Sequence, residues 1–352
     1  MKLASPFFVH NRTRRTLVKG ALGAAAVGAF PGSAFAQAKK LGSVEYAVAS
    51  IDPVYAMAYT AFKKGYFSDA GLDVKYLNAQ SGPRAKQMLA AGQIFMATSG
   101  ASDSVALTIA GKPSVLVAAI DARVPWANIL TSKKLYDAGL KDIKGLAGKS
   151  IGVTQPQSST WLMATYLADK AGLKDKVQIK PLGDLATMLG AVKSGSVECC
   201  MATFPMIDKA KEEGWGVPLF DITDSAAWNA MFGGEVPGAG CYVLQESIDK
   251  RPEAVQALVT GLVRAAGFIK DASPEEIAQT TQDYTAGFST PLVVRAVTVF
   301  KKTWSFDNLI TKESYDRMMS IMEGRQFTAA ELAAAPYAKA VNMSFVRAAR
   351  KT

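Results

Sequence analysis

Short runs of β-branched and other apolar residues alternate with longer helical stretches from Ser43 onward. Glycines follow three of the helical stretches, at Gly65, Gly92 and Gly111, where a helix commonly ends. We therefore expect strands at 44–48, 72–77, 94–98 and 114–120 and helices at 55–64, 83–91 and 103–110. Because strand and helix alternate strictly, the pattern predicts a parallel sheet covered by helices.

The same order of elements starts again near Lys144. Asp184 is a suitable N-cap for one helix of this second set. The pattern places strands at 150–153, 177–180 and 197–201 and helices at 160–170 and 185–193. A repeated set of α/β elements predicts two lobes.

The last third of the chain has a different pattern. A strand at 241–244 is followed only by helices, at 252–270, 274–286, 291–303 and 312–323. Helices without a sheet of their own most simply pack onto a lobe that already exists. We therefore expect a helical C-terminal tail.

Residues 1–36 resemble an export signal. A basic segment ends at Lys19, an apolar stretch runs from Gly20 to Phe30, and small residues precede the end of the region at Ala36. The segment 13–19 resembles the twin-arginine consensus. A membrane anchor is the alternative, but the apolar stretch is far shorter than the roughly 20 residues of a spanning helix. We expect cleavage after Ala36 and a product in the periplasm.

Composition narrows the range of functions. The chain has 352 residues, 49% of them hydrophobic, with 40 Lys and Arg against 30 Asp and Glu. Five of the basic residues lie in the leader, which has no Asp or Glu, and the remaining excess is scattered along the chain. A scattered excess is typical of a solvated surface, so we expect no nucleic-acid partner.

Histidine and cysteine usage limits the catalytic chemistry. His10, the only histidine, lies in the leader, so the processed chain has no imidazole for a Ser-His-Asp or Cys-His site or for a histidine-containing zinc site. Cys199, Cys200 and Cys241 are best read as small buried apolar residues, although a bridge from Cys241 to one of the other two stays open.

The segment Ala61–Val74, AFKKGYFSDAGLDV, runs from a helix through a turn into a strand. It resembles the signature of extracytoplasmic solute-binding proteins that serve ABC importers of nitrate, sulfonate, taurine and pyrimidine precursors. Further pieces of that family's pattern occur in order: LAAGQI at 89–94, IAGKP at 109–113, IKGLAGKSIGV at 143–153 and AVKSGSVE at 191–198. The resemblance extends over about residues 43–222.

This resemblance implies the two-lobed type II periplasmic-binding-protein fold, with a mainly parallel sheet in each lobe. We place the two segments that cross between lobes near 125–131 and 235–241. Lobe 1 then comprises 37–128 and 240–352, and lobe 2 comprises 129–239. The resemblance also implies a monomer without cofactor or metal that hands a small organic anion, a sulfonate or carboxylate, to the permease of an ABC importer and performs no catalysis.

Two alternatives to transport remain. The same fold resembles pyrimidine-precursor synthases that carry a cysteine-rich strand and a reactive histidine, and Glu198-Cys199-Cys200-Met201 occupies a comparable strand. This chain has adjacent cysteines instead, and no histidine after processing. The other alternative is a binding protein that reports its ligand to a membrane sensor.

Candidate ligand contacts follow the carboxyl ends of the expected strands, where parallel α/β sheets bind ligands. The loops there span 50–55, 80–84, 99–102, 154–160 and 202–205. Their hydroxyl, glycine and amide positions are candidates for holding an anion: Ser81, Gly82, Ser99, Gly100, Ser102, Gln157, Ser158, Ser159, Thr160 and Thr203. Each hydroxyl has a local alternative as a helix N-cap.

Two basic and several aromatic residues complete the candidate site. Arg84 and Arg123 can each form a bidentate pair with a carboxylate or sulfonate, with surface exposure as the alternative. Tyr55, Trp126 and Phe204 can provide an apolar wall for an organic ligand, with core packing as the alternative.

Overall fold

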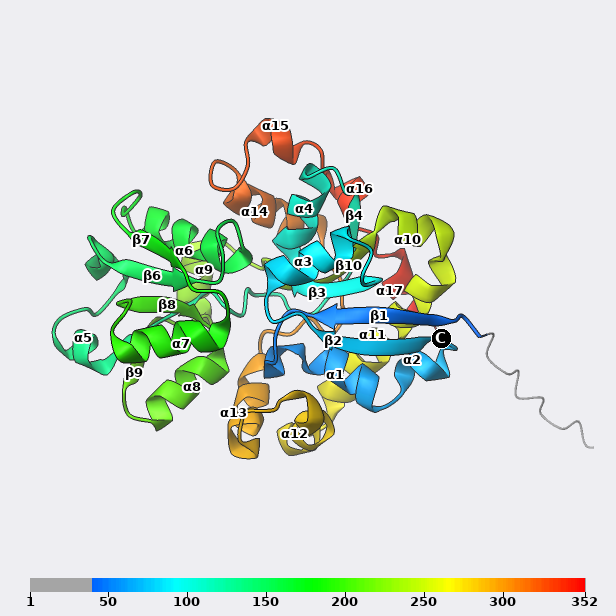
Figure 1. Cartoon of the computed structure of the whole chain (residues 1–352), viewed down its shortest axis with the longest axis horizontal. Helices are drawn as coiled ribbons and strands as arrows, with labels where there is room; N and C mark the ends of the chain where they lie inside the picture. Colours follow the sequence, from blue (N-terminus) through cyan, green and yellow to red (C-terminus); the bar gives the residue numbers. More distant parts are fainter. Residues whose placement is uncertain (1–39, 352) are drawn as a thin grey trace, which may run out of the picture. The chain divides into compact units, whose positions relative to one another are not determined.

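The computed structural model of the chain describes residues 40–351 (Figure 1). The expected export signal at 1–36 and its cleavage site lie outside the described residues. Within the described range, no helix combines the length and the apolar character needed to cross a membrane.

Five strands form the sheet of the first lobe, in the order β2-β1-β3-β10-β4. β1, β2 and β3 pair in parallel, while β10 lies antiparallel between β3 and β4. The strands are β1 (Ser43–Val48), β2 (Asp73–Asn78), β3 (Met96–Gly100), β4 (Ser114–Ala119) and β10 (Ala239–Leu244). The connecting helices are η1 (Pro53–Tyr55), α1 (Ala56–Lys63), α2 (Tyr66–Asp69), α3 (Gly82–Ala90) and α4 (Ala101–Ile109).

The sheet of the second lobe has the order β7-β6-β8-β5-β9, which repeats the first. Its strands are β5 (Asn128–Ser132), β6 (Ser150–Val153), β7 (Gln178–Pro181), β8 (Cys199–Ala202) and β9 (Gly216–Phe220). Its helices are α5 (Lys133–Asp137), η2 (Ile143–Leu146), α6 (Ser159–Lys170), α7 (Leu185–Ser194), α8 (Phe204–Glu212) and α9 (Ser225–Phe232). The expectation of two lobes with mainly parallel sheets is confirmed.

The prediction that all strands run parallel is wrong for one strand in each lobe. β5 runs antiparallel to β8 and β9, as β10 does to β3 and β4. Both strands follow a crossing of the chain from the other lobe. The chain leaves one sheet at the carboxyl ends of its parallel strands. It then enters the other sheet at the carboxyl ends of that sheet's strands, so the entering strand runs antiparallel to them. The segment 125–131 thus supplies part of a strand as well as a crossing.

The central strands explain why the sequence shows continuous apolar runs. Every residue of β3, β6 and β8 is buried, as expected for central strands covered on both faces. β4 is equally buried although it stands at the edge of its sheet. The edge strands β2 and β7 are partly exposed. Asp184 caps α7 as expected, because its side chain accepts a hydrogen bond from Thr187 N.

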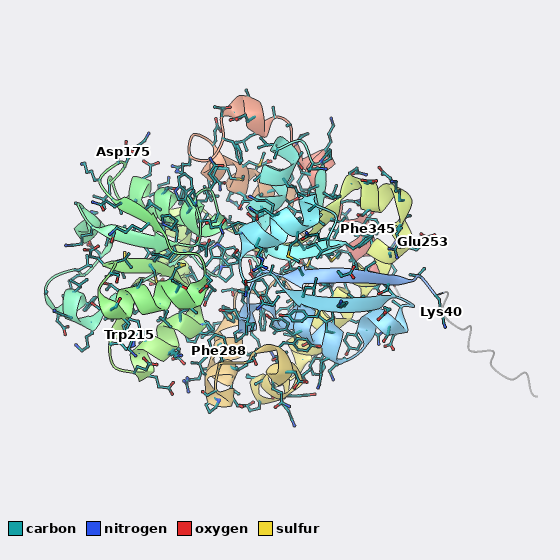
Figure 2. All side chains as sticks on the ribbon, in the orientation of Figure 1. Lys40, Asp175, Trp215, Glu253, Phe288 and Phe345 are labelled. Atoms are coloured by element: carbon teal, nitrogen blue, oxygen red, sulfur yellow. The ribbon has the colours of Figure 1, made fainter. Side chains whose placement is uncertain are left out.

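The C-terminal tail is helical, as expected. Its helices are α10 (Gln245–Lys250), α11 (Pro252–Asp271), α12 (Pro274–Thr281), η3 (Gln282–Tyr284), α13 (Thr290–Phe300), α14 (Lys312–Met322), α15 (Ala329–Leu332), α16 (Tyr337–Ala340) and α17 (Ser344–Ala349). α11 packs against α1, α2 and α17 on the first lobe, where Figure 2 labels Glu253 and Phe345.

The tail also contacts the second lobe. α13 packs against α8, where Arg295 Nε lies 2.6 Å from Asp208 Oδ2. Beyond α14, Arg325 forms an ion pair with Asp169 of α6. The tail therefore bridges the lobes at two places in addition to the chain crossings.

Asp121 lies just before the first crossing segment and hydrogen-bonds the second one. Its carboxylate is buried and accepts hydrogen bonds from Gly238 N at 3.0 Å and from Ala239 N at 3.0 Å. Burial raises the pKa of Asp121 well above its usual value, while these two amides act in the opposite direction.

Candidate functional site

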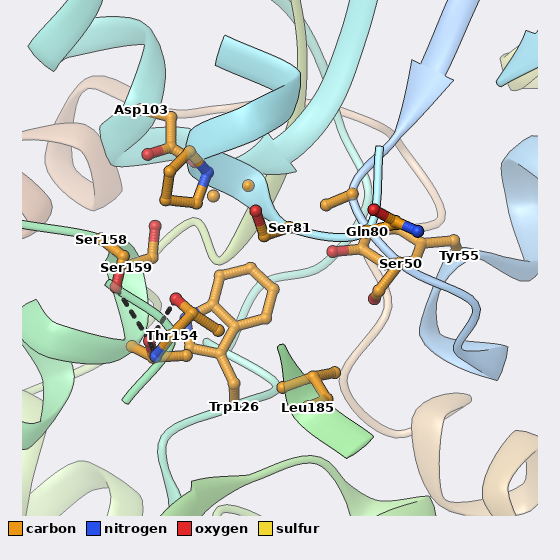
Figure 3. A pocket seen from close by; sticks show the side chains of 15 residues that line it. Ser50, Tyr55, Gln80, Ser81, Asp103, Trp126, Thr154, Ser158, Ser159 and Leu185 are labelled. Atoms are coloured by element: carbon orange, nitrogen blue, oxygen red, sulfur yellow. Dashed lines mark hydrogen bonds between the residues drawn. The ribbon is translucent and has the colours of Figure 1, made fainter. Parts of the chain in front are cut away.

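A cavity of about 50 Å³ lies where strand ends of the first lobe meet the second lobe (Figure 3). The lobe-spanning Trp126 forms part of its wall. The first lobe contributes Ala49, Ser50, Tyr55, Gln80, Ser81, Gly82, Pro83, Gly100 and Asp103. The second lobe contributes Thr154, Ser158, Ser159, Thr160 and Leu185.

Two of the helices that begin at this cavity, α3 and α6, are capped by a serine. Ser81 Oγ accepts a hydrogen bond from Arg84 N at the start of α3, and Ser158 Oγ accepts one from Trp161 N at the start of α6. The local role as N-cap and the position in the cavity wall therefore coincide. The positive ends of both helix dipoles lie at the cavity.

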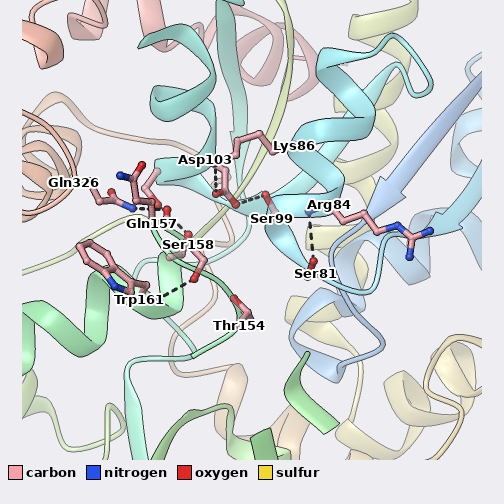
Figure 4. Close-up of polar contacts among 12 residues, drawn as sticks. Ser81, Arg84, Lys86, Ser99, Asp103, Thr154, Gln157, Ser158, Trp161 and Gln326 are labelled. Atoms are coloured by element: carbon pink, nitrogen blue, oxygen red, sulfur yellow. Dashed lines mark hydrogen bonds and ion pairs between the residues drawn. The ribbon is translucent and has the colours of Figure 1, made fainter. Parts of the chain in front are cut away.

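The residue before each capping serine has an unusual backbone conformation. Gln80 has φ 68° and Gln157 has φ 57°, a region that residues other than glycine rarely adopt. Gln157 is also held from the tail, because Gln326 Nε2 donates a hydrogen bond to its carbonyl oxygen at 2.7 Å (Figure 4). Strained positions of this kind cluster at ligand sites.

Direct contacts join the lobes beside the cavity. Ser102 Oγ and Ser159 Oγ are 2.9 Å apart, and Thr203 Oγ1 donates to Asp52 Oδ2 at 2.7 Å. Gly100 permits this approach, since a Cβ atom at that position would lie 1.8 Å from Ser159 Oγ.

Asp103 provides the charge in the cavity wall. Its side chain is 2% exposed, Ser99 Oγ donates to its Oδ2 at 2.8 Å, and Lys86 Nζ lies 3.6 Å from its Oδ1 (Figure 4). Among the residues that line the cavity there is no lysine or arginine.

Trp126 has an unsatisfied donor. The residue is 6% exposed, and its indole Nε1 is buried without a hydrogen-bond partner among residues 40–351. A buried donor without a partner costs about 1–3 kcal/mol. An acceptor on a bound molecule would remove that cost.

The two candidate arginines lie outside the cavity lining. The exposed Arg84 side chain turns away from the second lobe (Figure 4). Its guanidinium group donates a hydrogen bond to Gln80. Arg123 donates to Ile222 O and to Ser225 Oγ, both at 2.9 Å. Both guanidinium groups are therefore engaged within the chain.

The other candidates fall into two groups. Eight line the cavity: Tyr55, Ser81, Gly82, Gly100, Trp126, Ser158, Ser159 and Thr160. Five lie behind it or beside it: Ser99, Ser102, Gln157, Thr203 and Phe204. Of these, Phe204 packs edge-on against Phe300 of α13.

Three lining residues belong neither to the loops chosen from the sequence nor to the other candidates. Ala49 lies before the first loop, Leu185 begins α7, and Asp103 lies in the first turn of α4. An acidic residue in a first turn ordinarily indicates a favourable contact with the helix dipole, so the sequence pattern gave no reason to place Asp103 at a ligand.

The three cysteines are free and buried, so the open possibility of a disulfide is not realised. Burial raises the thiol pKa of Cys199, Cys200 and Cys241, which disfavours the reactive thiolate. No group of three or more metal-ligating side chains occurs within residues 40–351.

Two repeated α/β lobes, with a cavity at the strand ends between them, define the periplasmic-binding-protein fold. The model of the NMT1/THI5-like family matches residues 52–277, and the chain belongs to this family.

Known proteins extend this comparison. A Brucella abortus protein that carries a binding-protein name is 27% identical over 225 residues, which cover 64% of this chain and 66% of the relative. The chain thus matches just under two thirds of that relative's length. A Bordetella bronchiseptica structure has a TM-score of 0.78 at 27% identity, covering 88% of this chain and 97% of its own.

Two more distant structures share the fold. The Xanthomonas axonopodis alkanesulfonate-binding protein SsuA, bound to MOPS, has a TM-score of 0.70 at 15% identity and covers 86% of this chain and 98% of its own. The Synechocystis nitrate-binding protein NrtA has a TM-score of 0.71 at 14% identity, with 88% of each chain covered.

Asp52 should make stability depend on pH. Burial raises the pKa of Asp52 to about 6, against the hydrogen bonds from Val54 and Thr203. The folded state therefore binds a proton more tightly than the unfolded state, so the free energy of unfolding falls as pH rises from about 4 to about 6. This contribution is on the order of 3 kcal/mol at most. Urea unfolding at pH 4 and pH 7 should show this loss of stability in the wild type and a smaller loss in Asp52→Asn, where Asp121 still contributes.

The cross-lobe hydrogen bond supplies a second variant for this measurement. Thr203→Val removes the hydroxyl that stabilises the charged form of Asp52, so the pH-dependent step should move to higher pH. Identical pH dependence in the wild type and in Asp52→Asn would show that Asp52 is not the titrating group.

Proposed function

We propose that this protein is the exported solute-binding component of an ABC importer, which captures a small organic ligand with a sulfonate or carboxylate group between its lobes. The observation that carries the proposal is a cavity lined from both lobes in a chain of the NMT1/THI5-like family. The sulfonate-binding and nitrate-binding proteins that share its fold support this reading.

The anionic group of the ligand would be held without a lysine or arginine from the cavity lining. The N-termini of α3 and α6 face the cavity with their capping serines, and the indole N–H of Trp126 has no partner within residues 40–351. Helix N-termini and N–H donors together bind anionic oxygens. Tyr55, Trp126, Pro83 and Leu185 add apolar surface for the organic part.

Capture would require the lobes to separate and close again. We assign residues 37–128 and 240–352 to lobe 1 and 129–239 to lobe 2, with the crossings between them as the hinge. The leader would send the chain to the periplasm by the twin-arginine route, with cleavage after Ala36. There it would act as a monomer with a membrane permease.

Binding without catalysis fits the chemistry of the described residues better than the synthase alternative. Cys199 and Cys200 are fully buried in β8, away from the cavity lining, and burial raises their thiol pKa. The imidazole that the synthases use has no counterpart in residues 37–352.

A ligand screen tests the proposal. The processed chain, residues 37–352, is heated with sulfonates, carboxylates, aromatic acids, nitrate or pyrimidines. A ligand of the native state at 100 times its Kd adds about 2.7 kcal/mol of stability and raises the Tm. Mass spectrometry should recover the ligand unchanged after prolonged incubation. Conversion of the bound compound would instead establish an enzyme.

A variant at Gly100 tests whether ligand capture needs the close approach of the lobes. Gly100→Ala places a Cβ 1.8 Å from Ser159 Oγ, so it should weaken binding of any compound found in the screen at least about tenfold while the chain still folds. Ser159→Gly removes the clashing atoms, and the double variant should recover affinity relative to Gly100→Ala. Unchanged affinity in Gly100→Ala would contradict closure at this point.

Gly190 provides the matched control. It lies within α7, and an added Cβ there would meet no atom within 4 Å. Gly190→Ala should therefore bind the same compound as the wild type does.

A further inference from the structure

A turn of the C-terminal tail, residues 323–327 between α14 and α15, contacts the second lobe; we call it the tail turn. Its own backbone holds it, because Gly324 N donates to Phe327 O at 2.8 Å and Gln326 N donates to Met322 O at 2.9 Å. The helices that follow pack on the first lobe, α15 against α4 and α16 against β4. Contacts between the tail turn and the second lobe therefore connect the two lobes.

Two adjacent side chains of the tail turn reach opposite ends of α6. Arg325 forms an ion pair with Asp169 in the last turn of α6, and its guanidinium carbon lies 4.9 Å from the ring centre of Tyr166. Gln326 Nε2 donates to Gln157 O at 2.7 Å, just before α6 begins (Figure 4). The helix whose N-terminus faces the cavity is thus held at both ends from behind the cavity.

The contact from Gln326 acts on a strained part of the backbone. Gln157 has φ 57°, and such a conformation persists only where the surroundings hold it. Gln326 is 8% exposed, so its hydrogen bond to the Gln157 carbonyl is shielded from water. The next residues, Ser158 and Ser159, line the cavity, and Ser158 Oγ accepts the hydrogen bond from Trp161 N that caps α6. Release of Gln157 would therefore let these two serines leave the cavity wall.

We propose that the tail turn is a latch on the closed lobes, in which Gln326 positions the loop 157–160 and Arg325 makes the second contact. The latch engages only when the lobes meet. This inference rests on the proposed solute-binding function and adds a control over it, because the affinity for the solute then depends on side chains that lie behind the cavity.

Contacts present only in the closed form shift the equilibrium between open and closed lobes. The apparent affinity for a solute that needs the closed form scales with the population of that form. A neutral hydrogen bond such as that of Gln326 corresponds to a change of about 3- to 10-fold in that population. A partly exposed ion pair such as that of Arg325 corresponds to about 2- to 5-fold.

An engineered pair of thiols measures closure without any solute. Ser102 Oγ and Ser159 Oγ are 2.9 Å apart across the lobes, so Ser102→Cys combined with Ser159→Cys can form a disulfide only when the lobes meet. In a glutathione redox buffer, the oxidised fraction of the pair gives its effective concentration, which rises and falls with the closed population. The three native cysteines are free and buried, which keeps them out of the exchange.

Variants of the latch are compared in this double-cysteine background of the processed chain. Gln326→Leu, which removes the donor at similar volume, should lower the effective concentration about 3- to 10-fold. Asp169→Ala, which removes the ion pair from the second lobe and leaves the tail turn intact, should lower it about 2- to 5-fold.

A glycine at position 157 distinguishes positioning from simple support of the fold. Glycine adopts a positive φ without strain, so Gln157→Gly added to Gln326→Leu should recover at least about half of the lost effective concentration. A residue that only supports the tail would show no such recovery.

The matched control lies in α14 itself. Lys312→Met removes the exposed ion pair between Lys312 and Asp316, both on α14, and it should leave the effective concentration unchanged. If Gln326→Leu fails to fold, Asp169→Ala decides, because it alters the second lobe alone.

An unchanged effective concentration in Gln326→Leu and in Asp169→Ala would overturn the latch. A loss in Gln326→Leu without recovery in the variant that also carries Gln157→Gly would remove Gln326 as the positioning residue. Both measurements are made without solute, so they are independent of the ligand screen, whose failure would count against the proposed function.

Discussion

The buried carboxylate of Asp121 joins the two places where the chain passes between lobes. It accepts hydrogen bonds from the amides of Gly238 and Ala239, the residues that lead into β10. β10 then lies between β3 and β4 in the first sheet. Gly238 also accepts a hydrogen bond from Ala101 N at 2.7 Å through its carbonyl oxygen, which connects this junction to the cavity wall at Gly100.

The crossings of the chain between the lobes also separate the features that the sequence could predict from those that it could not. Local patterns of apolar residues placed the five strands of the first sheet, the strands β6, β7 and β8 of the second and the N-cap Asp184, because these features depend on neighbours in the chain. The strands β5 and β9 were not predicted. The antiparallel direction of β5 and β10 depends on where the chain crosses, which periodicity does not record. The loops at the strand ends were found, since they follow from the order of strands and helices.

Individual side chains at the site were harder to predict. Arg84 and Arg123 were chosen for their chemistry, but the structure directs their guanidinium groups to Gln80 and to Ile222 and Ser225. Asp103 was overlooked because an acidic residue early in a helix has an ordinary local explanation. Asp103 reaches the cavity wall because it is buried beside the second lobe, and this arrangement appears only in the tertiary structure.

The contacts between the lobes describe a closed arrangement. Ser102 meets Ser159, Thr203 meets Asp52, and the cavity beside these contacts has a volume of about 50 Å³. In the proposed function these contacts part to admit the solute and form again around it, so binding and closure are one equilibrium.

Small-angle scattering of the processed chain, with and without a compound whose binding calorimetry has established, tests this claim most directly. The account predicts a larger radius of gyration for the free protein and a decrease at saturating ligand. An identical scattering profile in the two states would contradict capture by closure of the lobes.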